Sequence, residues 1–206
     1  MFTSIAHPIG VARLRCGPPV PCLSLYRATE AVVAGILGGE FVDIGGGHGR
    51  TLAEILQRNP QMHGVLFDLP HALEGGRRTI GEAGLAERCK VISGDFFVSV
   101  PAGCDTYMLS RVIHDWNAEQ ALAILKVVRE AIASNGRLIL LETMLRPAGE
   151  SIYPVLSDIN MLIRTGGCER TEAEYRALYR AGGFELTRTV ATSAPTGTTV
   201  IEGRPV

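Results

Sequence analysis

Neither sign of charge predominates in this sequence of 206 residues, in which 20 Lys and Arg side chains stand against 21 Asp and Glu. The formal charge of −1 at pH 7 provides no basic surface for a polyanion, so we expect no nucleic-acid partner. Long apolar runs are lacking as well. The best run, residues 31–37, falls far short of the roughly 18 to 20 residues that a membrane span requires, so no membrane segment is expected.

Cysteine is sparse and offers no recognisable site. The five cysteines are scattered, and none forms a C-x-x-C pair: Cys16, Cys22, Cys89, Cys104 and Cys168. Neither a disulfide framework nor a zinc site is indicated, and reduced thiols favour a cytoplasmic location. The length fits one domain, and hydrophobic residues make up 46% of the chain, which is enough for one core.

The first 40 residues differ from the remainder of the chain. No acidic residue precedes Glu30, and the run GPPVP at residues 17–21 cannot continue a helix. We expect residues 1–40 to be irregular, as a tail, a linker or the stub of a missing domain. A transit peptide is less favoured because the prolines interrupt an amphipathic helix. Residues 41–206 then form the folded domain.

From Glu40 onward, short apolar runs alternate with helix-length periodic segments, a pattern typical of βαβ units around a parallel sheet. We expect strands at residues 41–44, 64–68, 88–93, 105–109 and 136–142, closing strands at 184–192 and 198–202, and helices at 51–58 and 118–133. Thr171 and Glu174 have the spacing of a capping box, which predicts the start of another helix. The expected fold class is α/β, with a doubly wound, mostly parallel sheet.

Glycines alternate directly after the first of these strands, at Gly45, Gly47 and Gly49. Glycine lets the backbone turn sharply and lets a ligand approach without a Cβ in the way. The spacing does not match the G-x-G-x-x-G dinucleotide fingerprint, because its last position is not glycine in either frame. Asp43, two residues before the turn, would repel a pyrophosphate and suits a ligand with a cationic end. S-adenosylmethionine, which carries an ammonium and a sulfonium, fits this description.

Two further acidic residues, Asp68 and Asp95, follow later strands. Ligands of doubly wound sheets bind outside the carboxyl ends of the strands, so both acids are expected to face the same crevice as the glycine turn. We expect Asp68 to accept from both ribose hydroxyls and Asp95 to accept from the adenine amino group, with Phe96 covering the ring. Each aspartate taken alone is equally well a helix cap or a turn residue. All three acids in order favour a nucleoside site.

Polar residues suited to chemistry follow the fourth expected strand. His114 is the natural general base, because its unperturbed pKa of ~6.5 lets it take a proton near neutral pH. Taken alone, it is as well explained as a cap of the following helix. Glu142, at the end of the fifth strand, needs a partner such as an imidazole N–H, and Glu169 can approach from the other side.

Six segments occur together in a characteristic order: VDIGGGHG at 42–49, FDLPH at 67–71, GDFF at 94–97, HDW at 114–116, LE at 141–142 and GGCERT at 166–171. They resemble the S-adenosylmethionine-dependent O-methyltransferases of the caffeate and hydroxyindole type, including bacterial members that act on aromatic natural products. The resemblance covers about residues 41–206. It implies a Rossmann-like class I methyltransferase fold, whose seven-stranded, mostly parallel sheet has an antiparallel closing strand.

The resemblance also implies a role for each site residue. His114 would deprotonate the acceptor hydroxyl while Glu142 and Glu169 flank and orient its imidazole, with no metal required. The methyl group of S-adenosylmethionine would then move by in-line displacement. The implied cofactor positions are Asp43, Gly45, Gly47, Asp68, Leu69, Gly94, Asp95, Phe96 and Ser110. The implied positions for a small aromatic or polyketide-type acceptor, with a phenolic hydroxyl, are Asp115, Asn160 and Met161.

The chain departs from this family in two respects. Members generally are homodimers in which a helical domain before the glycine turn forms the dimer and closes the acceptor pocket, whereas here 40 residues precede the turn region. Ser110 stands where many relatives have a lysine beside the cofactor. Apolar surface on the helix that contains Met161 is then expected to be exposed. Two alternatives stay open: a non-catalytic remnant that binds the cofactor or pairs with an intact homologue, and a different reaction at the same cofactor site.

Overall fold

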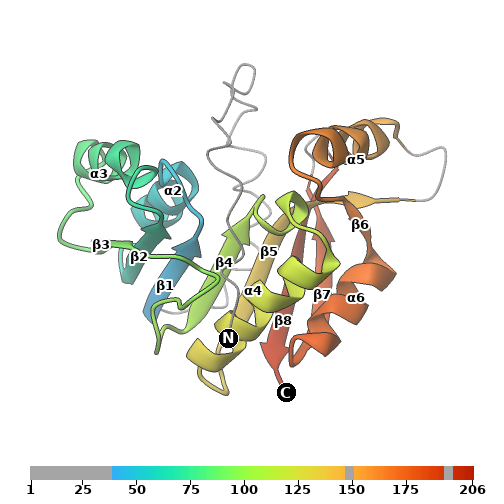
Figure 1. Ribbon diagram of the computed structural model, residues 1–206. Helices are drawn as coiled ribbons and strands as arrows, with labels where there is room; N and C mark the ends of the chain where they lie inside the picture. Colours follow the sequence, from blue (N-terminus) through green and yellow to red (C-terminus); the bar gives the residue numbers. More distant parts are fainter. Residues whose placement is uncertain (1–38, 147–150, 193–196) are drawn as a thin grey trace, which may run out of the picture.

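The computed structural model describes residues 39–146, 151–192 and 197–206, and strands and helices alternate through most of them (Figure 1). The strands are β1 (Gly39–Ile44), β2 (Met62–Asp68), β3 (Cys89–Ser93), β4 (Thr106–Ser110), β5 (Arg137–Leu145), β6 (Arg170–Thr171), β7 (Phe184–Ala191) and β8 (Thr198–Pro205). The helices are α2 (Arg50–Arg58), α3 (Leu73–Glu82), α4 (Ala118–Ala131), α5 (Tyr153–Arg164) and α6 (Glu172–Ala181), with a short 3-10 helix, η1 (Ile113–Asp115).

The strands form one sheet in the order β3-β2-β1-β4-β5-β8-β7. β1 pairs in parallel with β2 on one side and β4 on the other, so that Val42 lies between Val65 and Tyr107. β8 runs antiparallel to its neighbours β5 and β7. The expected mostly parallel sheet with an antiparallel closing strand is thus confirmed. The two-residue β6 pairs with the end of β5 and adds an eighth strand that the sequence did not predict.

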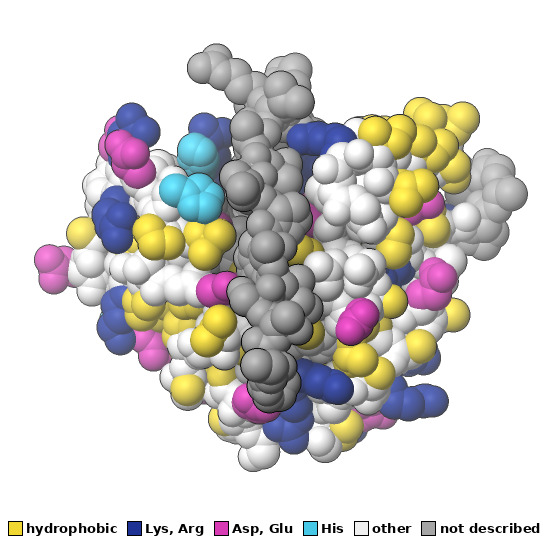
Figure 2. Space-filling view, in the orientation of Figure 1, with side chains coloured by type: hydrophobic (Ala, Val, Ile, Leu, Met, Phe, Trp, Pro, Cys, Tyr) yellow, Lys and Arg dark blue, Asp and Glu magenta, His cyan; other side chains and the backbone are white. Residues whose placement is uncertain are grey.

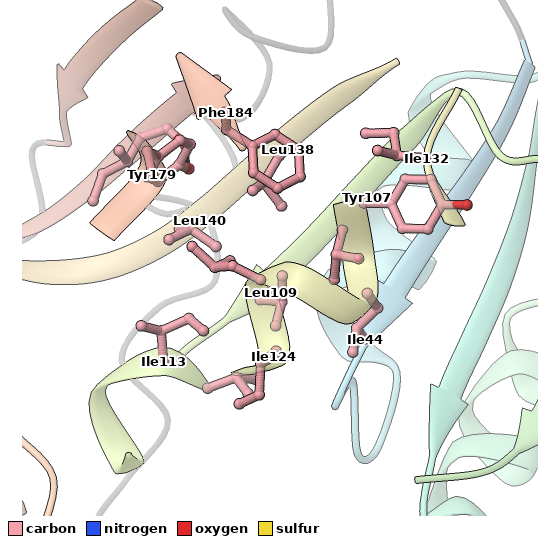
Figure 3. Packing of buried hydrophobic residues seen from close by; sticks show 14 of the residues in the cluster. Ile44, Tyr107, Leu109, Ile113, Ile124, Ile132, Leu138, Leu140, Tyr179 and Phe184 are labelled. Atoms are coloured by element: carbon pink, nitrogen blue, oxygen red, sulfur yellow. Dashed lines mark hydrogen bonds between the residues drawn. The ribbon is translucent and has the colours of Figure 1, made fainter. Parts of the chain in front are cut away.

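Helices cover both faces of the sheet, as expected of a doubly wound fold. Successive side chains of a strand point to opposite faces. Ile44 therefore packs in the cluster that includes α4 and α6, whereas Phe41 packs in the cluster that includes α2 and α3. In Figure 3, Leu109 and Leu140 of neighbouring strands meet Ile124 of α4. Full burial of an aliphatic side chain contributes about 1.5–3 kcal/mol, so these two layers fix the sheet.

The order of the strands in the sheet, compared with their order in the chain, shows where a ligand is expected to bind. The chain continues from β1 to β2 on one side, and later returns to place β4 on the other side of β1. The strand order therefore reverses between β1 and β4. In open α/β sheets, ligands bind outside the carboxyl ends of the strands at such a reversal. The glycine turn, which follows β1, and η1, which follows β4, both lie at this edge of the sheet, where the strands have their carboxyl ends.

The predicted capping box at the start of α6 is confirmed. Thr171 Oγ1 accepts from the Glu174 amide at 3.3 Å, and Glu174 Oε2 accepts from the Thr171 amide at 2.8 Å. At the amino end of the domain, β1 begins at Gly39, two residues before the predicted strand. The remainder of the predicted irregular segment, residues 1–38, lies outside the described residues.

α5 presents an unusually apolar exposed surface. Its two buried residues are Pro154 and Met161. Its exposed large hydrophobic residues are Tyr153, Val155, Leu156, Ile159, Leu162 and Ile163. Figure 2 shows hydrophobic side chains gathered over this helix, which agrees with the exposed apolar surface expected there. Across the described ranges, no helix is both long and apolar enough to traverse a lipid bilayer.

Candidate active site

The alternating glycines of the first turn follow from its backbone conformation. Gly45, Gly47 and Gly49 have φ angles of 69°, 55° and 67°, the left-handed region that side chains with a Cβ rarely adopt. Space is also limited, because a Cβ on Gly45 would come within 2.8 Å of a methyl carbon of Val112. The turn therefore packs directly against the segment that leads into η1.

Asp68 connects the glycine turn to the end of β2. Its Oδ2 accepts from the Gly47 amide at 2.8 Å, and its Oδ1 accepts from the Leu69 amide at 2.7 Å. A carboxylate offers about four lone-pair sites, so these two amides leave two of them for other donors. The structure thus holds the Asp68 carboxylate in a fixed orientation beside the turn, where it was predicted to bind ribose.

Asp43 lies beneath the turn, away from solvent. It is 1% exposed, and a Cβ on Gly46 would come within 2.6 Å of its Oδ2. Burial, with a smaller contribution from the negative charge of Asp68, raises the pKa of Asp43 to about 8. The carboxyl group therefore holds its proton more readily than an ordinary aspartate, which weakens the argument that a fixed negative charge at this position attracts a cationic ligand. Its role as a cofactor residue stays a prediction.

The loop after β3 reaches the same turn. The Gly94 amide donates to the Asp68 carbonyl at 3.1 Å, and Asp95 Oδ1 accepts from the Phe97 amide at 2.9 Å. The Phe96 ring lies 3.7 Å from the position of a Cβ on Gly45. The predicted cofactor residues of the first three loops are therefore brought together at one edge. Of the other two predicted cofactor residues, Leu69 is exposed and Ser110 is half-buried at the end of β4.

His114 lies in η1, between two glutamates. Its Nδ1 is 3.1 Å from Glu169 Oε1 and 3.6 Å from Glu142 Oε2, and both glutamates are buried. A carboxylate oxygen accepts, so the Nδ1 atom carries the hydrogen of this pair and donates to Glu169. In the neutral imidazole, the lone pair is then on Nε2, which lies 3.8 Å from Oδ1 of the half-buried Asp115. The ring is oriented for proton transfer at Nε2.

The charges around His114 determine its protonation. Burial alone lowers the pKa of His114, but the negative charges of Glu142, Glu169 and Asp115 outweigh it and raise the pKa to about 9. Burial raises the pKa of Glu142 to about 7, although the nearby imidazolium opposes the increase. His114 is therefore mostly protonated at neutral pH, which corrects the expectation of an ordinary histidine with a pKa near 6.5.

Three residues that the sequence analysis did not identify hold this arrangement. Arg170 donates to the carbonyls of Ile113 and Trp116 at 3.1 and 2.8 Å, and so fixes both ends of η1. Ser157 Oγ donates to Glu169 Oε1 at 2.7 Å, and the Glu169 amide donates to Asp158 Oδ1 at 2.9 Å. Ser157 and Asp158 both come from α5. No motif spacing indicates these contacts, because their partners lie far apart in the sequence.

α5 also carries two of the predicted acceptor residues. Met161 is 5% exposed and lies one helical turn after Ser157, which contacts Glu169. Asn160 is exposed on the same helix. The structure thus brings the helix with both residues next to the His114 cluster, while their contact with an acceptor stays a prediction.

His114, Glu142 and Glu169 also have the spacing of a metal site. Each offers one donor atom, and these atoms lie within 4.8 Å of one another. The imidazole Nδ1 also lies at hydrogen-bond distance from Glu169, 3.1 Å, so the same three side chains can share a proton. The expectation that the reaction requires no metal stays a prediction.

Comparisons with known proteins show what the chain resembles. Residues 34–185 match the model of the O-methyltransferase domain. The phenazine O-methyltransferase PhzM of Lysobacter antibioticus is 38% identical over 165 residues, which cover 80% of this chain and 48% of that protein. The chain spans about half the length of the curated relatives it matches.

Solved structures give the same result. The mitomycin 7-O-methyltransferase MmcR matches with a TM-score of 0.80 and 31% identity, over 89% of this chain and 54% of that one. NcsB1, an O-methyltransferase of neocarzinostatin biosynthesis, matches with a TM-score of 0.74 and 32% identity, over 82% of this chain and 49% of that one. The latter was solved with S-adenosylmethionine and 2-hydroxy-5-methyl naphthoic acid.

Proposed function

This chain belongs to the O-methyltransferase domain family, and from that premise we propose that it is an S-adenosylmethionine-dependent O-methyltransferase. The proposed acceptor is a phenolic hydroxyl of a small aromatic or polyketide-type molecule. The observation that carries the proposal is the position of His114: its imidazole lies at the same sheet edge as the glycine turn, with Nδ1 held by Glu169. The named relatives and the ligands of NcsB1 support both the reaction and the acceptor class.

The residues beside the glycine turn suit the cofactor. Asp68 has two lone-pair sites left for the ribose hydroxyls, and the Phe96 ring beside Gly45 suits an adenine face. S-adenosylmethionine supplies a methyl group bonded to a positively charged sulfur. Asp43 completes the set of acids beneath this turn, and it lies close enough to Asp68 for the two charges to interact.

His114 would act on the acceptor. A phenol with a pKa of ~10 is mostly protonated at neutral pH and is a poor nucleophile. Nε2 of the neutral imidazole takes its proton, and Glu142 and Glu169 stabilise the imidazolium that results. Asp115, Asn160 and Met161 would orient the acceptor ring, and such orientation contributes up to about 7–11 kcal/mol in oriented reactions.

We also propose one domain that extends from β1 to residue 206, and so begins two residues earlier than the predicted start at residue 41, and a cytoplasmic location, from the element pattern and the scattered cysteines.

The direct test is a transfer assay with methyl-labelled S-adenosylmethionine and a panel of phenols and hydroxylated aromatic polyketides. Binding of S-adenosylhomocysteine, measured by calorimetry, is the control. Transfer of label to a phenolic oxygen supports the proposal. Binding without transfer to any acceptor would favour the non-catalytic alternative, and the absence of binding would reject the cofactor assignment.

The rate of transfer is expected to rise with pH up to about 9. The reason is the raised pKa of His114, since the imidazolium has no lone pair and only the fraction that has lost its proton is a base. The slope of log(kcat/KM) against pH should approach one below this pKa. A plateau that begins near pH 6.5 would show that the glutamates do not influence the base.

Glu169→Gln separates ionisation of His114 from ionisation of the acceptor, because the acceptor is the same in both proteins. The variant removes one negative charge from the imidazole at 3.1 Å. The midpoint of the dependence of kcat/KM on pH should therefore move to lower pH by about one pH unit, while the pKa of the acceptor stays constant.

A change in the backbone behind His114 should also slow the reaction. A Cβ on Gly167 would overlap the backbone of His114 and Asp115, so η1 must move in Gly167→Ala. We expect an activity loss of about tenfold or more and a decrease of about 1–3 kcal/mol in the free energy of unfolding. Gly166→Ala is the matched control. Its Cβ meets no atom within 4 Å, so the φ of 75° causes strain without moving η1. Equal activity loss in both variants would contradict the explanation.

A further inference from the structure

Three buried polar atoms, on the two glutamates that flank His114 and on Tyr175, lack a hydrogen-bond partner. Over the described residues, five buried side-chain oxygens are in this condition, and three of them are Glu142 Oε2, Glu169 Oε2 and the hydroxyl of Tyr175. Tyr175 is 0% exposed. Buried polar atoms in native proteins are almost always satisfied, by protein or by ordered water. Two of the three atoms belong to the glutamates that flank His114, and Tyr175 lies close enough to both glutamates for their charges to act on its hydroxyl, so the three atoms indicate a shared partner.

The topology brings Tyr175 to both glutamates. Glu142 lies on β5 an even number of residues from Leu138 and Leu140, so its side chain points to the same face of the sheet. That face packs in the cluster that contains Tyr175 and Tyr179 of α6. Glu169 approaches from the other direction, because it directly precedes β6, which pairs with the end of β5 and leads into α6.

The first oxygen of each glutamate is already engaged. Glu142 Oε1 accepts from the amides of Val112 and Ile113, at 3.1 and 2.8 Å. Glu169 Oε1 accepts from Ser157 and is the oxygen nearest His114. Glu142 Oε2 lies 3.6 Å from His114 Nδ1, which is too long for a hydrogen bond, so the second oxygens of both glutamates still need a donor.

Within the part of the chain that the structure describes, the other charged and titratable groups that act on Tyr175 do not provide that donor. Arg170 lies close enough to lower the pKa of Tyr175, but its guanidinium donates to the carbonyls of Ile113, Cys168 and Trp116. The Tyr179 hydroxyl donates to the carbonyl of Ile201 at 2.9 Å. Asp115 contributes only a further negative charge, on the Nε2 side of His114.

We propose that Tyr175 is a positioning residue for His114. The Tyr175 hydroxyl donates to one buried water, and this water donates to the second oxygens of Glu142 and Glu169. The inference rests on the proposed function. The water accepts from the Tyr175 hydroxyl and donates one hydrogen to each carboxylate, which gives it the three hydrogen bonds usual for a buried water. Because burial and both glutamates keep the pKa of Tyr175 well above 10, the hydroxyl retains its proton and acts as the donor.

This arrangement has a measurable consequence for His114. A donor stabilises the charged form of a carboxylate, and two charged carboxylates hold the imidazolium. Loss of the Tyr175 hydroxyl removes this stabilisation, so Glu142, whose pKa burial already raises to about 7, should retain its proton more readily and the pKa of the imidazole should decrease.

The test compares Tyr175→Phe with Tyr179→Phe. Both residues are fully buried in α6 one helical turn apart, and each variant loses only a hydroxyl. The pKa of His114 is measured by NMR titration of the imidazole resonances in the full chain, and His114→Asn identifies the resonance. We expect Tyr175→Phe to lower this pKa by at least about half a pH unit, while Tyr179→Phe leaves it unchanged.

An unchanged pKa in Tyr175→Phe would overturn the proposal, particularly if the variant melts at a higher temperature, because an unsatisfied hydroxyl is better removed. A crystal structure of the unmodified chain gives a second test. Electron density for a water within hydrogen-bond distance of all three atoms is expected, and its lack would also overturn the proposal. This test distinguishes failure of the Tyr175 proposal from failure of the proposed function, because the NMR titration of His114 does not depend on methyl transfer.

Discussion

Methyl transfer is expected to slow by about 10²- to 10⁴-fold when His114 is replaced by alanine, the range that a general base usually contributes. The acceptor then has no base at the position that Nε2 occupies. Affinity for S-adenosylhomocysteine should stay the same, because the predicted cofactor residues lie on the turn after β1 and at the ends of β2, β3 and β4, and His114 is not one of them. The dependence of the rate on a group with a pKa near 9 should also disappear.

Two further variants serve as controls for His114→Ala. His114→Asn retains an amide that can donate to Glu169, so it limits the repulsion between the two buried glutamates. His63→Ala removes an exposed histidine at the amino end of β2, far along the strand from Asp68, and should be as active as the parent. If His114→Asn binds the cofactor and transfers methyl groups as fast as the parent, His114 is a structural residue.

The parts of this site that the sequence predicted are those determined within a few residues of chain. Gly45, Gly47 and Gly49 alternate because every second position of the turn is left-handed and needs glycine, and that need is visible in the sequence. Likewise, Thr171 and Glu174 form their capping box within one helical turn. The sheet was predictable for a similar reason, since the alternation of apolar runs and periodic segments follows from local pattern.

The parts that were missed depend on contacts between distant residues. Arg170 reaches the Ile113 carbonyl across 57 residues of sequence, and nothing beside either residue indicates the pairing. The protonation of His114 and Asp43 could not be predicted because it depends on burial and on charges from other strands. Tyr175 looks like an ordinary core residue of an amphipathic helix until its hydroxyl is seen to be buried without a partner.

Replacement of Asp68 by alanine should weaken S-adenosylhomocysteine binding by about a hundredfold or more. The variant loses both predicted bonds to the ribose, and hydrogen bonds to a charged group are worth about 1.5–3 kcal/mol each. It also loses the acceptor that holds the Gly47 amide at 2.8 Å, so the turn itself becomes less ordered. Isothermal titration calorimetry measures the change in Kd.

The matched control for this variant is Asp105→Ala. Asp105 Oδ2 also accepts a backbone amide from a neighbouring segment, that of Glu40 at 2.8 Å, but it does so at the amino end of β1, opposite the glycine turn. Both variants lose a carboxylate that accepts from the backbone, so both should lose some thermal stability, and only Asp68→Ala should lose cofactor affinity. Asp68→Asn then separates charge from shape, because its amide retains one acceptor and replaces the other with a donor. Full binding by Asp68→Ala would show that the carboxylate merely organises the turn and that the ribose is held elsewhere.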